Sequence, residues 1–266
     1  MIMKICVCIK EVPDSDVPIN KLRIDSENLK VLPTENISSI VNSFDLNAVE
    51  LALRFSESVE NSSVSIISVG SNLSSDVIKK PIAMGADEII TCDDKKNINI
   101  DVHGTALILS KLIKKTGPYD IIFSGRHASD FDMSTVPFAL SEMLSIPILN
   151  IVKNIKKEGE KVLIERIITD GYQLIESKLP LIVTAGNQVG NPRYSTLKGI
   201  MRASKKEINN FTLDQLNLNR KDIETKVKLE KIYFPENENK VEMIEGNNSK
   251  EKAVKLISKL KESGII

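Results

Sequence analysis

The fold of this chain is decided by the stretch from 119 to 144, which reads YDIIFSGRHASDFDMSTVPFALSEML. A short apolar run stops at Gly125, a polar loop follows, and a helix is expected from Thr135 to Leu144. A strand, a loop and a helix in that order make up the repeating unit of a parallel sheet.

The same alternation fills the first two-thirds of the chain. The predicted strands are 3–9, 64–69, 88–92 and 119–124, and the predicted helices are 44–56, 74–84 and 104–115. Pro81 must kink or restart the helix in which it falls. Alternation of this kind predicts an α/β protein with a doubly wound, mostly parallel sheet.

The pattern changes after Pro147, which opens a further extended stretch. A hairpin is predicted around Asp170-Gly171, a strong turn dipeptide, and a strand at 181–184. The turn-rich segment 186–199 is expected to contain a short helix capped by Ser195. From about Lys205 the chain is charged and irregular, and it ends in a predicted helix at 250–261. A tail this polar is expected to lie against another domain or partner.

Composition narrows the possible functions. The 266 residues carry 36 basic and 36 acidic side chains, which argues against a nucleic-acid partner. Cys6, Cys8 and Cys92 have neither the spacing of a metal site nor that of a disulfide framework, so reduced thiols in a cytoplasmic protein are expected. Neither a signal-peptide layout nor an apolar run long enough for a membrane span is evident.

Ligands of open α/β sheets bind beyond the carboxyl ends of the strands, and the loop after Gly125 is the most informative of these. The start of the following helix offers free N–H groups, Ser134 and Thr135 offer hydroxyls, and Arg126 adds positive charge. These features predict a pyrophosphate cradle. In the alternative reading, Asp132 caps the helix and the loop is only solvated.

Familiar catalytic and phosphate motifs are missing from the sequence. It contains neither a GxGxxG turn after a strand nor a GxxxxGK[ST] loop, and neither histidine belongs to a recognisable Ser-His-Asp pattern. No catalytic residue is therefore predicted. His127, beside the predicted phosphate site, is more typical of a cofactor hydrogen-bond partner than of a general base.

Seven segments, in order, resemble segments of the beta subunits of electron-transferring flavoproteins, over a region from Met3 to about Lys206. They are Lys10 to Asp14 (K-x-V-P-D), Asn42 to Glu50 (N-x-x-D-x-x-A-[VL]-E), Ala83 to Asp87 (A-M-G-A-D), Gly125 to Asp132 (G-[KR]-x-A-x-D-x-D), Glu165-Arg166, Leu179-Pro180 with Val183 to Ala185, and Asn191 to Leu197 with Ile200-Met201. The resemblance implies a Rossmann-like, adenine-nucleotide-binding domain at 1–205 and a C-terminal arm at 206–266 that packs on a larger alpha subunit.

The resemblance also implies roles for individual residues. The implied nucleotide contacts are Cys8, Lys10, Asp14, Asn42, Ser43, Phe44, Asp45, Val69, Gly125, Arg126, His127, Ala128, Ser129, Asp130, Asp132, Met133, Ser134 and Thr135. A loop at 193–202 is expected to dock a flavin-dependent dehydrogenase, and Glu165 to pair with the alpha subunit. The docking residues are Arg193, Tyr194, Leu197, Ile200, Met201 and Arg202, with Leu197 as the apolar anchor flanked by positive charge.

The resemblance allows either of two bound nucleotides. The simple carriers of the family bind AMP, and the electron-bifurcating branch binds a second FAD. Val12-Pro13-Asp14 favours FAD, which would exchange hydride with NAD(H) and send electrons to the dehydrogenase and to ferredoxin or flavodoxin. Thr135 and Pro137 stand where the family usually has Gln and Gly, which removes one expected cofactor contact. The alternative of another class is a stand-alone adenine-nucleotide-binding regulator or hydrolase.

Overall fold

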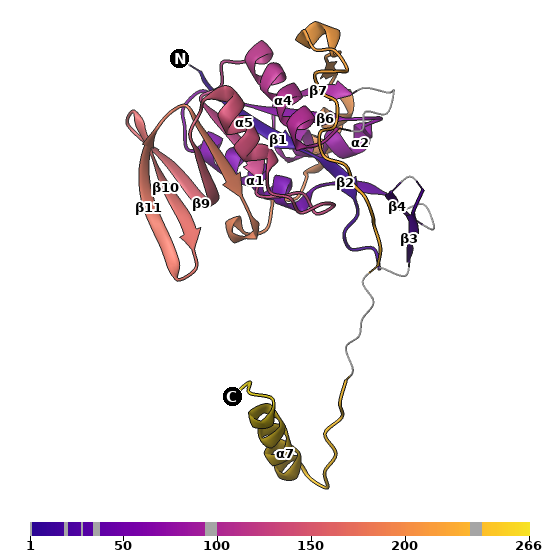
Figure 1. Cartoon of the computed structure of the whole chain (residues 1–266). Coiled ribbons are helices and arrows are strands. Elements are labelled where there is room, and N and C mark those ends of the chain that lie inside the picture. Colours follow the sequence, from indigo (N-terminus) through magenta and orange to yellow (C-terminus); the bar gives the residue numbers. More distant parts are fainter. Residues whose placement is uncertain (1, 19–20, 28, 34–37, 94–99, 235–240) are drawn as a thin grey trace. The chain divides into compact units, whose positions relative to one another are not determined.

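The computed structural model describes residues 2–18, 21–27, 29–33, 38–93, 100–234 and 241–266. Within these residues, a nine-stranded sheet has the order β11-β10-β9-β12-β8-β1-β6-β7-β13, and two further sheets have two strands each (Figure 1). The doubly wound, mostly parallel sheet predicted from the sequence is confirmed.

The central sheet is parallel from β9 to β13. Its parallel strands are β1 (Met3–Ile9), β6 (Ser62–Gly70), β7 (Glu88–Asp93), β8 (Ile121–Gly125), β9 (Ile148–Glu158), β12 (Leu181–Ala185) and β13 (Ile208–Asn210). The predicted hairpin is β10 (Lys161–Ile168) with β11 (Gly171–Lys178), antiparallel to each other and to β9. Gly171 has φ +143°, a value that favours glycine at this turn.

Helices cover both faces of the parallel strands. Ile5 and Val7 of β1 pack in one cluster with α1 (Ser43–Glu57), α2 (Ser75–Ile78) and α3 (Lys80–Met84). Cys6 and Cys8, which alternate with them, pack in a second cluster with α4 (Val102–Thr116) and α5 (Val136–Leu144). Strands buried on both faces explain why their sequences are continuous apolar runs.

The strand order reverses at β1. The chain runs from β1 to β6 and β7 on one side, and then returns to place β8 on the other side of β1. The loops after β1 and β8 therefore leave neighbouring strands in opposite directions, and the space between them is the standard ligand position of such a sheet.

Two local expectations about helices needed correction. The helix after the loop that follows Gly125 begins at Val136 rather than at Thr135, so Met133 to Thr135 belong to the loop. The short helix α6 (Leu197–Lys205) is capped by Thr196, whose hydroxyl accepts the N–H of Gly199, and the prediction of Ser195 as its cap was wrong. Both residues are good caps, and their one-residue difference depends on where tertiary packing starts the helix.

Short elements went unpredicted because they contain too few residues for a periodic pattern. They are the ribbon strands β2 (Glu11–Pro13) with β5 (Ser39–Val41) and β3 (Leu22–Asp25) with β4 (Lys30–Pro33), the edge strand β13, and the 3₁₀ turns Asn187–Val189 and Asp214–Leu216. The strand β13 follows the expected domain boundary at 205 and pairs with β7. The chain stays with the larger compact unit as far as Glu230.

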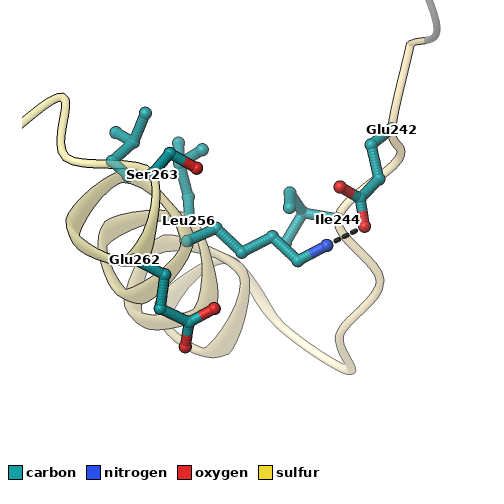
Figure 2. A pocket seen from close by; sticks show the side chains of 7 residues that line it. Glu242, Ile244, Leu256, Glu262 and Ser263 are labelled. Atoms are coloured by element: carbon teal, nitrogen blue, oxygen red, sulfur yellow. Dashed lines mark ion pairs between the residues drawn. The ribbon is translucent and has the colours of Figure 1, made fainter.

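The smaller compact unit comprises Ile24–Lys30 and Lys231–Ile266 and contains α7 (Ser249–Glu262). The side chain of Asn248 caps α7 by accepting the N–H of Glu251. Figure 2 shows a depression between α7 and the preceding segment, closed on one side by the ion pair of Lys259 with Glu242. No residue of α7 is buried. Across the described parts of the chain, no helix is both long and apolar enough to cross a membrane.

Candidate functional site

The candidate site lies where β1 and β8 end side by side. Cys8 of β1 is in register with Ser124 of β8, and the two strands give way to loops at Lys10 and Arg126. The start of α1 lies against both loops through the side chains of Asn42 and Asp45.

Asp45 joins the two loops through backbone hydrogen bonds. Its Oδ2 accepts the N–H of Lys10 at 2.7 Å, and its Oδ1 accepts the N–H of Gly125 at 3.0 Å. A Cβ atom on Gly125 would lie 2.3 Å from Asp45 Oδ1 and 2.9 Å from its backbone N. Glycine is therefore required at 125 by this close approach.

Asn42 makes the matching bonds one turn earlier. Its Nδ2 donates to the carbonyl of His127 at 2.8 Å, and its Oδ1 accepts the N–H of Ser129 at 3.2 Å. Its own backbone N–H donates to the carbonyl of Lys10 at 2.9 Å. Asn42 has no exposed surface, so all of these bonds are sheltered from water.

The electrostatics of Asp45 reflect its burial. Removal from water raises the pKa of Asp45 to about 7, although the N–H groups of Lys10 and Gly125, the Asn42 side chain and the Lys10 charge favour the ionised form. A carboxylate in such a position is tolerated because both of its oxygens are hydrogen-bonded.

His127 forms the wall of the site with two neighbours. Its ring packs edge-on against Phe44 with centroids 4.0 Å apart, and the Arg126 guanidinium lies 5.6 Å from the Phe44 centroid. His127 Nδ1 lies 3.1 Å from Arg126 Nε and 3.0 Å from Asp132 Oδ1. Burial and Arg126 lower the pKa of His127, against the opposing effect of Asp132. A neutral ring accepts from Arg126 through Nδ1, or donates to Asp132 through it, but cannot do both.

Asp132 does not cap α5, so this part of the alternative reading of the sequence was wrong. The N-cap of α5 is Thr135, which makes no side-chain capping bond because its hydroxyl donates to the carbonyl of Met133 at 2.6 Å. The first turn of α5 thus keeps backbone donors for another acceptor, and Pro137 in that turn has no N–H to satisfy.

The loop before α5 is open and unusually shaped. Ser129 to Thr135 are exposed, and Asp132 and Ser134 both have left-handed backbones with φ near +50° (+52° and +53°). Non-glycine residues in that region cluster at ligand clamps. Lys10 secures the loop through an ion pair with Asp130 at 2.6 Å. An uncapped helix start, exposed hydroxyls and Arg126 fit an anionic phosphate group.

Two further implied contacts, Val69 and Asp14, lie in other segments of the chain. Val69 is on β6, which pairs with β1 up to Ile9. The strand β1 therefore lies between Val69 and the Gly125 end of β8. Asp14 follows β2, and its Oδ1 accepts the N–H of Asp16 at 3.0 Å, the geometry of an ordinary Asx turn.

The segment implied to dock a partner is fastened to α1 by buried ionic contacts. Arg193 donates through Nε to Glu50 Oε2 at 2.9 Å and reaches Glu57 through its other nitrogens. Glu50 is buried, and Arg54 donates to its second oxygen at 2.7 Å. Arg202 is also occupied within the chain, because it donates to the carbonyls at the end of α3, Ile82 and Ala86.

Beside these bonded arginines, the segment presents apolar side chains to solvent. Tyr194 is 94% exposed, Leu197 82%, Met201 64% and Ile200 51%. We refer to these four residues as the 194–201 ridge. Lys198 is the exposed basic side chain among them. An apolar group of this kind on a charged, rigidly fastened loop is typical of a protein-interaction surface.

The sequence is also similar to known proteins. The Electron transfer flavoprotein domain family matches residues 30–216. The chain belongs to the electron transfer flavoprotein beta-subunit family.

It is 37% identical to "Electron transfer flavoprotein subunit beta" of Thermoanaerobacterium thermosaccharolyticum, over 99% of this chain and 100% of the relative. It is 32% identical to "Caffeyl-CoA reductase-Etf complex subunit CarD" of Acetobacterium woodii, again over 99% and 100%. It is 33% identical to "Acryloyl-CoA reductase electron transfer subunit gamma" of Anaerotignum propionicum, over 77% and 76%.

Two motifs of this beta-subunit sequence are explained by their contact with each other. Glu50, the last residue of the N-x-x-D-x-x-A-[VL]-E segment, holds Arg193 of the distant Asn191-Pro192-Arg193 segment. Asn47 of the same helix donates to the carbonyl of Gly190 at 2.8 Å. Glu165, on β10, makes an ion pair with Lys153 of β9 at 3.1 Å, in a different part of the beta-subunit fold from the 194–201 ridge.

Two residues at the site escaped the sequence reading. Phe131 is exposed in the loop, with the Lys10 ammonium 5.6 Å from its ring. Gln188 follows β12, and its buried Oε1 has no hydrogen-bond partner among the described residues. A Cβ on Gly186 would meet that oxygen at 2.5 Å and Arg126 Cδ at 3.2 Å, so this turn abuts the Arg126 side of the site. The sequence did hold an indication of this close approach, because Gly186 is a glycine directly after a buried strand.

Proposed function

We propose that this chain is the beta subunit of a heterodimer, that it binds a nucleotide at the β1–β8 crevice, and that it relays electrons to a flavin-dependent dehydrogenase. The observation that carries the proposal is the convergence of three separate segments, Lys10, Asn42 to Asp45 and Gly125 to Asp132, at the point of strand reversal. Family membership supplies the electron-transfer role.

We propose FAD as the nucleotide. The support is the Val12-Pro13-Asp14 segment and the similarity over nearly the whole chain to CarD, whose name places it in a complex with caffeyl-CoA reductase. When bound, FAD supplies hydride exchange with NAD(H) and electron transfer to two acceptors, the alpha-subunit flavin on the way to a dehydrogenase, and ferredoxin or flavodoxin.

The residues of the chain bind and orient in this proposal, and none acts as a general acid or base. The free N–H groups at the start of α5, the hydroxyl of Ser134 and the Arg126 guanidinium hold the phosphates. The half-buried rings of Phe44 and His127 and the exposed Phe131 give the crevice apolar surface beside the phosphate position.

AMP is the second candidate, because the uncapped helix start recognises a phosphate without regard to what lies beyond it. The beta chain should be co-expressed with its alpha subunit, and the nucleotides released from the purified heterodimer counted by chromatography. Two FAD per heterodimer are expected. One FAD and one AMP would refute the FAD assignment and leave the site assignment intact.

We propose that the 194–201 ridge docks the dehydrogenase and that Glu165 and the C-terminal arm contact the alpha subunit. The support for the arm is α7, whose Val254 and Ile257 are about half exposed although they lie on its apolar face. A stand-alone regulator or hydrolase would need no such surfaces. That alternative predicts a stable chain without the alpha subunit, whereas we expect expression alone to give aggregated protein.

We also place the chain in the cytoplasm, because its three cysteines are buried thiols of a kind that suits a reducing compartment.

A further inference from the structure

Asn42 and Asp45 connect every part of the candidate nucleotide site. From one turn at the start of α1, their side chains accept the N–H groups of Lys10, Gly125 and Ser129 and donate to the carbonyl of His127. Two loops that are more than a hundred residues apart in the chain are thereby tied to a single point.

Each polar atom of the two side chains already has a hydrogen-bond partner within the chain. Both oxygens of Asp45 are occupied, and so are the oxygen and the nitrogen of Asn42. Asp45 is 6% exposed and Asn42 is fully buried. A nucleotide in the crevice can touch the exposed loop residues, but these two residues lie behind them.

We propose that Asn42 and Asp45 are positioning residues: they form a clasp that sets the β1 and β8 loops at the spacing the nucleotide requires, without contacting it. The inference rests on the proposed nucleotide site and changes the role that the family resemblance implied for both residues. The clasp includes Gly125, because any side chain there would collide with Asp45 Oδ1.

The charges around Asp45 agree with this role. Lys10 is the cation that acts on Asp45, yet its ammonium is directed to Asp130, 2.6 Å away, and only its backbone N–H bonds Asp45. A buried carboxylate is expensive unless backbone donors satisfy it. Here the two donors come from different loops, so the carboxylate is stable only when both loops are in place.

The test uses the isosteric variant Asp45→Asn in the heterodimer with the alpha subunit. An amide group replaces one oxygen, so the N–H of either Lys10 or Gly125 loses its acceptor. The matched control is Asp120→Asn, because Asp120 Oδ2 accepts the N–H of Lys4 at 2.7 Å, at the opposite end of the same strand. A merely structural role predicts equal effects of the two variants.

The readout is the dissociation constant of the stripped, folded heterodimer for AMP and for FAD, titrated separately well below the melting temperature. We expect Asp45→Asn to raise the dissociation constant for the nucleotide that the wild type binds by tenfold or more. We expect Asp120→Asn to change this constant less than twofold. Unchanged affinity in Asp45→Asn, or an equal loss in Asp120→Asn, would overturn the clasp. A wild type that binds neither nucleotide would instead refute the proposed site.

A second measurement needs no variant. If the clasp holds the loops, the amides of Lys10 and Gly125 stay protected from hydrogen exchange in wild-type heterodimer stripped of nucleotide, while the amides of the exposed residues Met133 and Ser134 exchange freely. Exchange of the Lys10 and Gly125 amides as fast as those of the exposed loop would show that the nucleotide, and not Asp45, fixes the loops.

Discussion

The buried carboxyl of Asp45 makes a prediction about stability that can be worked through with its sign. Its pKa is raised to about 7 in the folded protein, from the ordinary value of 3.8 that applies to the unfolded chain. The folded state therefore binds a proton that the unfolded state has already released. Asp45 adds most to the free energy of unfolding at low pH, and this contribution is lost as the pH rises through about 7.

The magnitude follows from the difference of about 3 pKa units. At 1.36 kcal/mol per unit, the full effect is about 4 kcal/mol, and about 2.5 kcal/mol of it falls between about pH 5 and pH 8. Other titrating groups contribute to the same pH range. The change Asp45→Asn removes only this one, so the difference between the two proteins isolates it.

The assay is urea unfolding of the wild type and of Asp45→Asn, each as heterodimer at one fixed concentration, from pH 5 to pH 8. The wild type should lose about 2.5 kcal/mol relative to the variant as the pH rises. The reasoning would be refuted if the free energies of unfolding of wild type and Asp45→Asn differed by the same amount at every pH. It would also be refuted if the wild type became more stable relative to the variant as the pH rises.

Four other changes follow from the contacts described. Leu197→Ala should lower electron transfer to the dehydrogenase at least about tenfold with an unchanged melting temperature, because Leu197 is exposed; unchanged transfer would remove the 194–201 ridge from docking. Arg193→Ala should cost about 2–3 kcal/mol in urea unfolding, because it leaves the buried Glu50 with one cation fewer; a cost under about 0.5 kcal/mol would contradict this. Gly125→Ala should release the nucleotide during purification, and full retention would show that the loop yields easily. Phe123→Ala should cost about 3–5 kcal/mol, measured in the same way, because the side chain is fully buried.

Periodicity in the sequence predicted most of the parallel core, because its longer strands and helices show a pattern. The hairpin of β10 and β11 was found from Asp170-Gly171, and the break of the 74–84 helix from Pro81. The loop from Gly125 to Asp132 was found as a polar interval between a strand and a helix. These features depend on neighbours within a few residues, and such neighbours are visible in a sequence.

Only the tertiary structure decided what the residues of the site do. Asp132 had the composition of a helix cap, yet it faces His127, because the loop turns through left-handed backbone before α5 starts. Arg193 and Arg202 were expected as the charged rim of a docking loop, and folding directs both inward to Glu50 and to the end of α3. Asn42 and Asp45 resembled cofactor contacts. In the fold, the Asn42 side chain bonds to backbone groups of His127 and Ser129, and Asp45 bonds to those of Lys10 and Gly125.

The physical reason is the same in each case. The sequence determined which residues are apolar, which are charged and where the chain turns, and this was enough to specify a doubly wound sheet with an anion-friendly loop. The partner of a polar side chain is chosen by strand order, which brings residues 45 and 125 together across 80 positions. A buried donor or acceptor must be satisfied wherever the fold places it, and only the folded chain shows by what.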